Sequence, residues 1–282
     1  MLARTDDLQH LTLVDQHVAF VDRDPRTGAT PLVFLHGGAV DHRIWGPQLD
    51  AFPERRVLAP DARGHGWSSN ATEARLCDDV VALLDALGIE RAVLAGISMG
   101  GATAVDAALE HPDRVAGVVT VGVGTSEPVF EDAWALDVFA QWERAAAAGD
   151  AEAWLGAFMA FVAGPRRTRA DVDPAVWDAV EAMASHTLAE QVVVDEHGVP
   201  VPPARPTGVT DTWSRLSGIS VPVLAIAGAE DADDHRRMAE RLVASVPHGE
   251  LVMIEDAAHY PNLERPERFN RVLGDFLAAG GL

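Results

Sequence analysis

A serine flanked by glycines is the residue of this sequence best placed for covalent chemistry. The segment Gly96-Ile97-Ser98-Met99-Gly100 follows the apolar run RAVLA and precedes the small-residue run ATAVDAALE. A G-x-S-x-G segment between a strand and a helix forms a sharp turn that exposes the serine hydroxyl above a sheet. Glycines are needed there because a side chain at either position collides across the turn. We therefore predict that Ser98 is a nucleophile.

A serine hydroxyl needs a neighbouring base, and the base needs a carboxylate that holds its tautomer and stabilises its charged form. When the nucleophile lies on such a turn, both partners follow it in the chain. His259 comes directly after the apolar run GELVMIED, in a loop that leads into a helix. Of the other downstream histidines, His111 lies at a helix end, His186 and His197 lie within residues 125–213, and His235 and His248 lie in or beside a surface helix. We predict that His259 is the base.

Four carboxylates follow the apolar run VPVLAIAG and compete for the role of the acid. Asp231 lies just beyond the end of the predicted strand, where a loop residue can reach back toward the histidine. Glu230, Asp233 and Asp234 fit better as residues that cap or solvate the following helix. An acid at the end of the preceding strand is the alternative, and it points to the region of Glu127. We predict Asp231 as the acid.

The tetrahedral intermediate of an acyl transfer places negative charge on the former carbonyl oxygen, so N–H donors must face that oxygen. One predicted donor is the backbone N–H of Met99, directly after the nucleophile. The other comes from the glycine turn after PLVFLH, where Gly37 and Gly38 let the backbone approach a substrate; we favour Gly38. His36 and His65 are predicted to be structural residues of their loops.

Charge limits the classes of partner. The 282 residues carry 43 acidic and 22 basic side chains, a formal net charge of -21, and no lysine. Nucleic acid is not expected as a partner, because phosphate binding needs clustered positive charge. Polyanionic substrates are disfavoured for the same reason. A neutral or weakly charged small molecule fits better.

The sequence also lacks the signals of several other classes. No stretch of about 18 apolar residues could span a bilayer, and the first residues lack the basic and apolar parts of a signal peptide, so we expect a cytoplasmic protein without a membrane partner. The single cysteine, Cys77, excludes an internal disulfide, and we expect it to be structural. No metal-ligand spacing, phosphate loop or dinucleotide fingerprint is present, so we expect no metal and no cofactor. The oligomeric state is not determined, and a homodimer is one form that the sequence allows.

Short apolar runs alternate with helical patterns through the first 120 residues, which predicts a mainly parallel sheet. Strands are expected within residues 31–38 and 55–66. A helix is expected to begin at Thr72 as N-cap and to end at Gly88. After residue 213, a strand, a helix, a strand and a final helix follow in turn.

Strand signals fade between residues 125 and 213, where we predict an inserted helical cap. This stretch is rich in aromatic residues, and Trp134, Trp142, Phe158 and Trp177 either line an apolar substrate pocket or bury the cap against the body. The segment DEHGVPVPPARPTGVT has too many prolines and glycines for regular structure, so we expect a surface loop or hinge there. Residues 1–124 and 214–282 are expected to form the core.

With these residues in view, the chain resembles the α/β-hydrolase superfamily, and in particular its bacterial esterases, enol-lactonases and cofactor-free perhydrolases. The matching segments are LHGG followed by Trp45, APDARGHGWSS, LAGISMGGATA, HPDRVAGVV, VPVLAIAGAED and DAAHYPNLERPERF. The resemblance implies an α/β-hydrolase fold, with a mostly parallel sheet, helices on both faces and a cap inserted after the sixth strand. It also implies a triad of Ser98, Asp231 and His259, with an oxyanion hole from Gly38 and Met99.

The expected reaction is hydrolysis of a carboxylic ester or lactone of a small, mostly apolar substrate through an acyl-enzyme. A C–C bond hydrolase, a perhydrolase or an acyltransferase with the same triad is the alternative, and a ligand-binding protein with little turnover is a more distant one. The serine nucleophile disfavours the dehalogenases and epoxide hydrolases of this fold, which attack with aspartate. Ala39 and Val40 follow the glycine turn where related peptidases continue with proline and glycine, which weakens an aminopeptidase reading.

Overall fold

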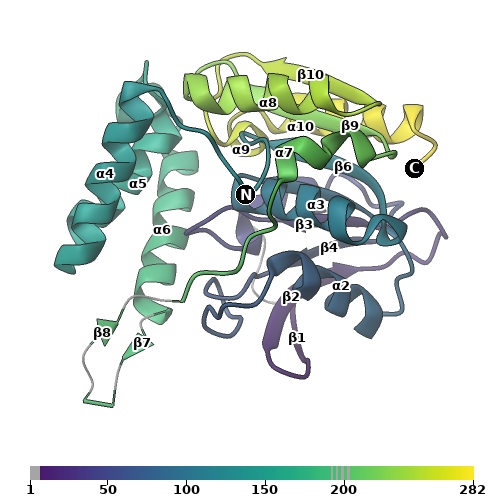
Figure 1. Ribbon diagram of the computed structural model, residues 1–282, viewed down its shortest axis with the longest axis horizontal. Coiled ribbons are helices and arrows are strands. Elements are labelled where there is room, and N and C mark those ends of the chain that lie inside the picture. Colours follow the sequence, from purple (N-terminus) through teal and green to yellow (C-terminus); the bar gives the residue numbers. More distant parts are fainter. Residues whose placement is uncertain (1–6, 192, 195, 198–199, 202–203) are drawn as a thin grey trace.

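A central sheet of eight strands, in the order β1-β2-β4-β3-β5-β6-β9-β10, runs through the body of the molecule (Figure 1). The computed structural model describes residues 7–191, 193–194, 196–197, 200–201 and 204–282. The strands are β1 Leu8–Thr12, β2 His17–Arg23, β3 Leu32–Leu35, β4 Val57–Pro60, β5 Ala92–Ile97, β6 Val115–Val121, β9 Val223–Gly228 and β10 Gly249–Ile254. The predicted mainly parallel sheet is confirmed.

The parallel part of the sheet runs from β4 to β10, and its inner strands are buried on both faces. β3 pairs in parallel with β4 and β5, and β6 pairs in parallel with β5 and β9. All residues of β3, β5, β6 and β9 are buried, as expected for strands that are covered by helices on both sides. β1 and β2 form an antiparallel hairpin at the edge, and β2 pairs antiparallel with β4. The sequence analysis did not anticipate this hairpin.

Helices cover both faces of the sheet, as predicted. α2, α3 and α8 share an apolar cluster with one face, and α10 shares a second cluster with the other face. The helices of the body are α1 Gly46–Leu49, α2 Leu76–Ala86, α3 Met99–Glu110, α7 Thr212–Arg215, α8 Asp233–Ser245, α9 Pro261–Glu264 and α10 Pro266–Ala279. Within the described residues, no helix combines the length and the apolar character needed to cross a membrane.

The predicted start of α2 is wrong, although its end is close to the expected residue. α2 begins at Leu76 with Arg75 as its N-cap residue. The hydroxyl of Thr72 accepts a hydrogen bond from the N–H of Ala74 instead, within a local turn. Gly88 follows the helix with a φ of 64°, a conformation in which glycine carries no steric penalty.

Residues 125–213, here called the cap segment, contain three long helices that lie to one side of the sheet in Figure 1. The helices are α4 Ala133–Ala148, α5 Ala151–Ala163 and α6 Pro174–Glu190. Each begins at an aspartate whose carboxylate accepts a backbone N–H of the first turn: Asp132, Asp150 and Asp173. Such caps satisfy N–H groups that have no partner within the helix. The limits of the cap segment as a separate unit stay a prediction.

A short strand lies inside the segment that was expected to be irregular, and its partner strand lies just before that segment. β7 Val193–Val194 pairs antiparallel with β8 Pro200–Val201, beyond the end of α6. The expectation of a loop without regular structure is therefore wrong at Pro200–Val201. Residues 195, 198–199 and 202–203 of the same segment lie outside the described residues, as do residues 1–6 at the start of the chain.

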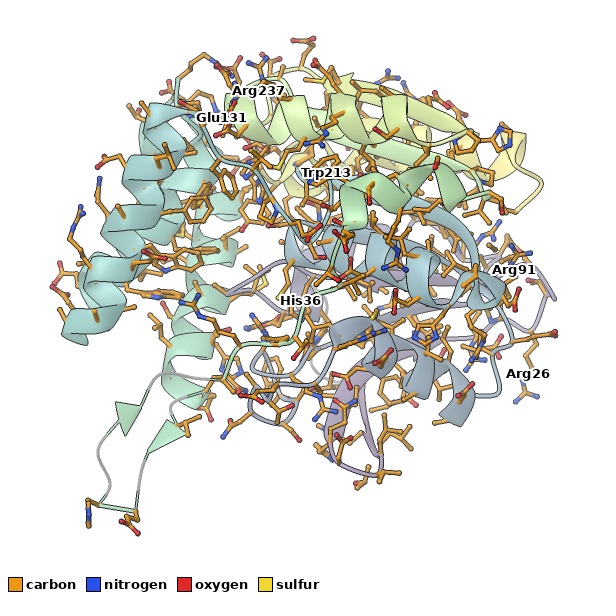
Figure 2. The ribbon with its side chains drawn as sticks, in the orientation of Figure 1. Arg26, His36, Arg91, Glu131, Trp213 and Arg237 are labelled. Carbon is orange, nitrogen blue, oxygen red and sulfur yellow. The ribbon has the colours of Figure 1, made fainter. Side chains whose placement is uncertain are left out.

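The two ends of the cap segment are fastened to the body and to each other. On α3, the carboxylate of Asp106 accepts a hydrogen bond from the hydroxyl of Ser126, 2.7 Å away, and another from the backbone of Val209. Asp234 on α8 accepts the N–H groups of Glu131 and Asp132 where α4 begins. Figure 2 shows Glu131 beside Arg237 at this junction, where their charged groups are 3.8 Å apart.

Asp106 makes stability depend on pH in a definite direction. Burial raises the pKa of Asp106 to about 6, and the hydrogen bonds from Ser126 and Val209 oppose this only in part. Because the folded-state pKa lies above the unfolded value, the folded protein binds more protons between the two values, and its stability falls as pH rises through that window. The contribution is fully present below about pH 4 and is lost as pH passes about 6.

We expect Asp106→Asn to remove this pH dependence of the unfolding free energy. Between pH 4 and 7, the unfolding free energy of the wild type should fall relative to the variant by about 1–3 kcal/mol. Urea unfolding of both proteins across that range measures the difference, whatever constant cost the substitution carries. A difference that stays constant with pH would contradict the assignment.

Candidate functional site

The turn between β5 and α3 is so tightly packed that only glycine fits on either side of Ser98. A Cβ atom on Gly96 would lie 2.1 Å from the carbonyl group of Gly100, and one on Gly100 would lie 2.2 Å from the carbonyl oxygen of Leu35. Ser98 itself has a φ of 50°, which is uncommon for a residue with a side chain. The turn leaves Ser98 partly exposed between a fully buried strand and a mostly buried helix.

The glycine turn after β3 runs directly beside Ser98. A Cβ atom on Gly37 would lie 3.5 Å from the Cβ of Ser98, whereas one on Gly38 would have no atom within 4 Å. Gly38 therefore borders open space next to the serine. α3 begins at Met99, and the first N–H groups of a helix have no partner within it and carry partial positive charge. The glycine turn and the start of α3 therefore both lie next to the serine.

His36 fastens this turn to the loop after β4. Its Nε2 accepts the N–H of Ala62 at 2.9 Å, so its Nδ1 carries the proton and donates to the carbonyl oxygen of Gly37 at 2.7 Å. Burial lowers the pKa of His36, and burial together with His36 lowers the pKa of His65 to about 4. Both rings have the environment of structural residues, as the sequence analysis expected.

Asp231 and His259 form a buried pair next to the end of β6. The Nδ1 of His259 lies 2.9 Å from Oδ2 of Asp231, and the two side chains are about as buried as core residues. The N–H of Ser98 donates to the carbonyl oxygen of Val121. At the next residue, a Cβ on Gly122 would lie 2.8 Å from the His259 ring. Ser98 and His259 thus flank the end of the same strand.

The need for glycine at position 122 was not recognised in the sequence. Gly122 has a φ of 61°, and its backbone passes so close to the pair that a side chain would strike both His259 and Asp231. The only signal is a glycine directly after a β-branched run, and such glycines also occur in ordinary turns. Its meaning depends on two residues more than 100 positions later in the chain.

A second histidine binds the same carboxylate. The Nδ1 of His235, on the first turn of α8, lies 2.8 Å from Oδ1 of Asp231, and this oxygen also accepts the N–H of Ala232 at 2.7 Å. His235 lies on α8, whose outer residues are exposed, as expected, but its own side chain faces inward and is 4% exposed. Burial alone would raise the pKa of Asp231, but the facing imidazoles of His235 and His259 outweigh burial and hold that pKa well below its usual range.

The other carboxylates of the acid loop have different partners. Glu230 and Asp233 pair with Arg166. Asp234 is fully buried rather than solvated, because it holds the start of the cap segment. The alternative acid, Glu127, accepts hydrogen bonds from Asp211 and Thr212 at the other end of the cap segment. The structure therefore places Asp231 beside His259 and engages Glu127 elsewhere.

Two consecutive arginines of the cap segment hold the loops of the pair. Arg166 donates to the backbone carbonyl oxygens of Ala229 and Asp231, at 2.9 and 3.0 Å. Arg167 binds Glu264, whose Oε1 accepts the N–H of Ala258, directly before His259. The acid loop and the histidine loop are thus both fastened to the same short stretch of the cap segment.

The aromatic residues of the cap segment differ in how close they lie to the His259–Asp231 pair. Trp134 packs edge-on against Phe161, and the ring of Phe161 lies 5.9 Å from that of His259. Trp142 and Phe158 pack against each other, with ring centroids 5.7 Å apart, within the cap segment. The last of the predicted set, Trp177, lies under the guanidinium of Arg169. Phe161, which was not singled out from the sequence, is an aromatic cap residue that lies next to the pair.

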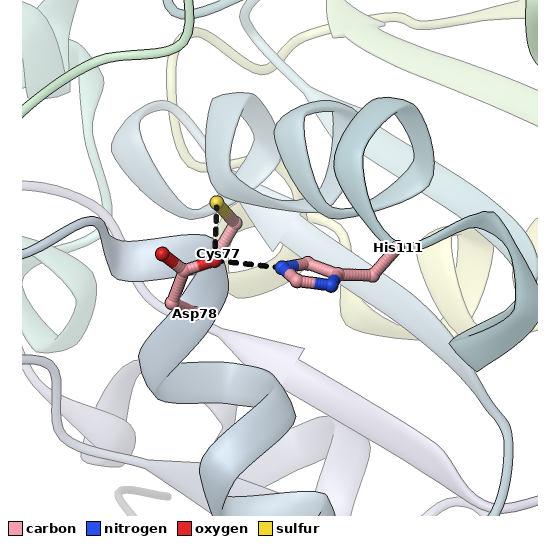
Figure 3. A group of neighbouring side chains, drawn as sticks. All are labelled: Cys77, Asp78 and His111. Atoms are coloured by element: carbon pink, nitrogen blue, oxygen red, sulfur yellow. Dashed lines mark hydrogen bonds and ion pairs between the residues drawn. The ribbon is translucent and has the colours of Figure 1, made fainter.

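A separate group of possible metal ligands joins α2 to the end of α3 (Figure 3). Asp78 accepts hydrogen bonds from the thiol of Cys77 and from Nε2 of His111. The guanidinium of Arg75 contacts both Cys77 and Asp78, so a positive charge already lies beside the group. Burial raises the pKa of the Cys77 thiol to about 11, which favours the neutral thiol. These contacts suit a structural cluster.

Comparison with known proteins gives a consistent result. A family model described as alpha/beta hydrolase fold matches residues 30–266. A 3-oxoadipate enol-lactonase of Acinetobacter baylyi is 30% identical over 253 residues, which cover 88% of this chain and 89% of that protein. Carboxylesterase YbfK of Bacillus subtilis is 27% identical over 265 residues, which cover 89% and 81%. The crystal structure of an enol-lactonase from Burkholderia xenovorans LB400 superposes with a TM-score of 0.72 at 25% identity, covering 96% of this chain and 100% of that one. The chain belongs to the α/β-hydrolase family.

Proposed function

We propose that this protein is a serine hydrolase that cleaves a carboxylic ester or lactone of a small, mostly apolar substrate through an acyl-enzyme on Ser98. The observation that carries the proposal is the buried, hydrogen-bonded pair of His259 and Asp231, across the end of β6 from the partly exposed Ser98. An enol-lactonase and a carboxylesterase among the relatives support the same bond type, whereas 2-hydroxymuconate semialdehyde hydrolases are also among them.

In the proposed first step, the hydroxyl oxygen of Ser98 attacks the carbonyl carbon. His259 takes the hydroxyl proton on Nε2, since its Nδ1 faces Asp231. The carboxylate of Asp231 keeps the ring in this tautomer and stabilises the imidazolium that forms. When the tetrahedral intermediate collapses, the C–O bond to the leaving alcohol breaks and the imidazolium returns the proton to that alcohol. A lactone retains its alcohol on the same molecule.

In the second step, His259 takes a proton from water, and the resulting hydroxide equivalent attacks the acyl-enzyme. Collapse releases the carboxylic acid and returns the proton to Ser98. In both steps, we assign the backbone N–H groups of Gly38 and Met99 to the developing oxyanion, where donors that are already oriented stabilise charge most effectively. The open space beside Gly38 is the feature that leaves room for this oxygen.

The preference for an apolar substrate rests on the rings that face the pair. Phe161 lies beside His259, Trp134 packs edge-on against Phe161, and we assign both rings to the substrate pocket. Trp142 and Phe158 pack against each other, so we assign them to holding the pocket wall. Trp177 remains a candidate pocket residue only because it belongs to the aromatic stretch of the cap segment.

We expect Ser98→Ala to lose kcat by about 10³-fold or more, because only binding and the oxyanion donors remain. The measurement is turnover of p-nitrophenyl esters of increasing chain length and of several lactones, with product analysis to separate hydrolysis from C–C cleavage, perhydrolysis and acyl transfer. Labelling by a fluorophosphonate probe should mark Ser98 in the wild type. Ser245→Ala, at the exposed end of α8, is the matched control and should retain full activity. Full activity in Ser98→Ala would refute the proposed mechanism.

The negative net charge predicts how salt should affect turnover of anionic substrates. With a formal net charge of -21, the protein should repel anionic substrates, and salt should screen that repulsion. Raising ionic strength from about 20 to 300 mM should increase kcat/KM for a succinate half-ester by about two- to tenfold and leave a neutral butyrate ester unchanged. A decrease with salt for the half-ester would instead indicate a local cationic group that binds carboxylates.

A further inference from the structure

The carboxylate of Asp231 is shared by two histidines. Oδ2 faces Nδ1 of His259 at 2.9 Å, and Oδ1 faces Nδ1 of His235 at 2.8 Å. The two imidazole rings lie 4.5 Å apart at an interplanar angle of 31°. His235 is therefore in contact with both the acid and the base of the proposed triad.

Local helix geometry places His235 there. Asp231 lies just before Ala232, the N-cap residue of α8, and its side chain folds back over the first turn of the helix, where His235 lies. Oδ1 thus receives one hydrogen bond from the Ala232 N–H and one from the imidazole. From the cap segment, Phe130 packs edge-on against His235 with ring centroids 5.8 Å apart, and Phe161 lies 6.0 Å away. The imidazole is held in one orientation among apolar rings.

Other charged groups near the first turn of α8 have their own partners. Asp233 pairs with Arg236 and Arg166, and Asp234 pairs with Arg237. Among the described residues, the titratable groups recorded in contact with the His235 ring are Asp231 and His259. The interaction of His235 is therefore directed at the proposed triad.

We propose that His235 is a positioning residue of this active site, which orients the Asp231 carboxylate by donating its Nδ1 proton and limits how strongly that carboxylate stabilises protonated His259. This proposal rests on the proposed function for its catalytic consequence, although its structural part stands without it. A carboxylate whose second oxygen already accepts two hydrogen bonds is a weaker partner for an imidazolium.

Removal of the His235 donor should shift the titration of His259 in a definite direction. Without His235, Oδ1 keeps only the Ala232 N–H, more of the negative charge acts on His259, and the imidazolium of His259 becomes more stable. The pH at which His259 is half protonated should therefore rise. The carboxylate is also less well oriented, so kcat on the high-pH plateau should fall while KM changes little.

The test compares His235→Phe, which fills the aromatic site without a donor, with His235→Asn, which keeps an N–H near the position of Nδ1. The first readout is NMR of protein with ¹⁵N-labelled histidine, with His259 assigned through His259→Gln. In His235→Phe, the half-protonation pH of His259 should rise by about 0.5–1 unit, and in His235→Asn it should stay near the wild-type value. His248→Phe, beyond the end of α8 and exposed, is the control and should match the wild type.

The wild type provides a check that does not depend on folding of a variant. Its spectrum should show His235 protonated on Nδ1, and a spectrum with that proton on Nε2 alone would overturn the proposal. Equal titration of His259 in the wild type and in folded His235→Phe would also overturn it.

The second readout is the pH profile of kcat/KM with a p-nitrophenyl ester. Its acidic limb should move to higher pH in His235→Phe by the same amount as the NMR midpoint, with kcat on the plateau about tenfold lower. A lower melting temperature with an unmoved limb would show a purely structural role and overturn the proposal. Failure of the proposed function is seen separately, as full activity in Ser98→Ala.

Discussion

The close crossing of β5, α3 and the end of β3 is the constraint on which the rest of the site depends. Because a Cβ on Gly100 would fall 2.2 Å from the carbonyl oxygen of Leu35, the helix can approach the strand only with glycine there. That approach puts the first turn of α3 beside the glycine turn that contains Gly38, and it leaves Ser98 between them with a φ of 50°. One steric condition therefore brings Ser98, the start of α3 and the glycine turn after β3 next to one another.

The buried carboxylate of Asp231 imposes the next condition. An ionised group 1% exposed must have its oxygens satisfied by hydrogen bonds, or its burial is costly. Both oxygens are occupied, and the backbone of the same residue is held from the cap segment by Arg166. Arg167 reaches the loop of His259 through Glu264. The cap segment is thus attached to the two loops that carry the pair, and a substitution in it can change the geometry of the pair without touching a substrate.

The sequence was most informative where a single local pattern decides the structure. Glycines around Ser98 between an apolar run and a small-residue run have few alternatives, and the alternation of strand and helix signals gave the parallel sheet. It was weaker where competing local interactions decide, as at Thr72, whose hydroxyl caps a turn rather than the helix. It failed at Gly122, which is needed because of side chains more than 100 residues later in the chain. It also missed the edge hairpin of β1 and β2 for a different reason, since the exposed, mixed residues of the outer strand give no clear strand pattern.

His235 shows a different limit of sequence reasoning. Histidines after the nucleophile were weighed as rivals for one role, whereas the fold lets two of them share one acid. During the proposed reaction, His259 must become positively charged, and a second positive charge in a ring 4.5 Å away would oppose this. The proposed role of His235 therefore lies in the hydrogen bond that its Nδ1 makes to Asp231 and not in a charge on its ring. The rings of Phe130 and Phe161, which pack on His235 from the cap segment, provide an apolar setting that suits such a donor.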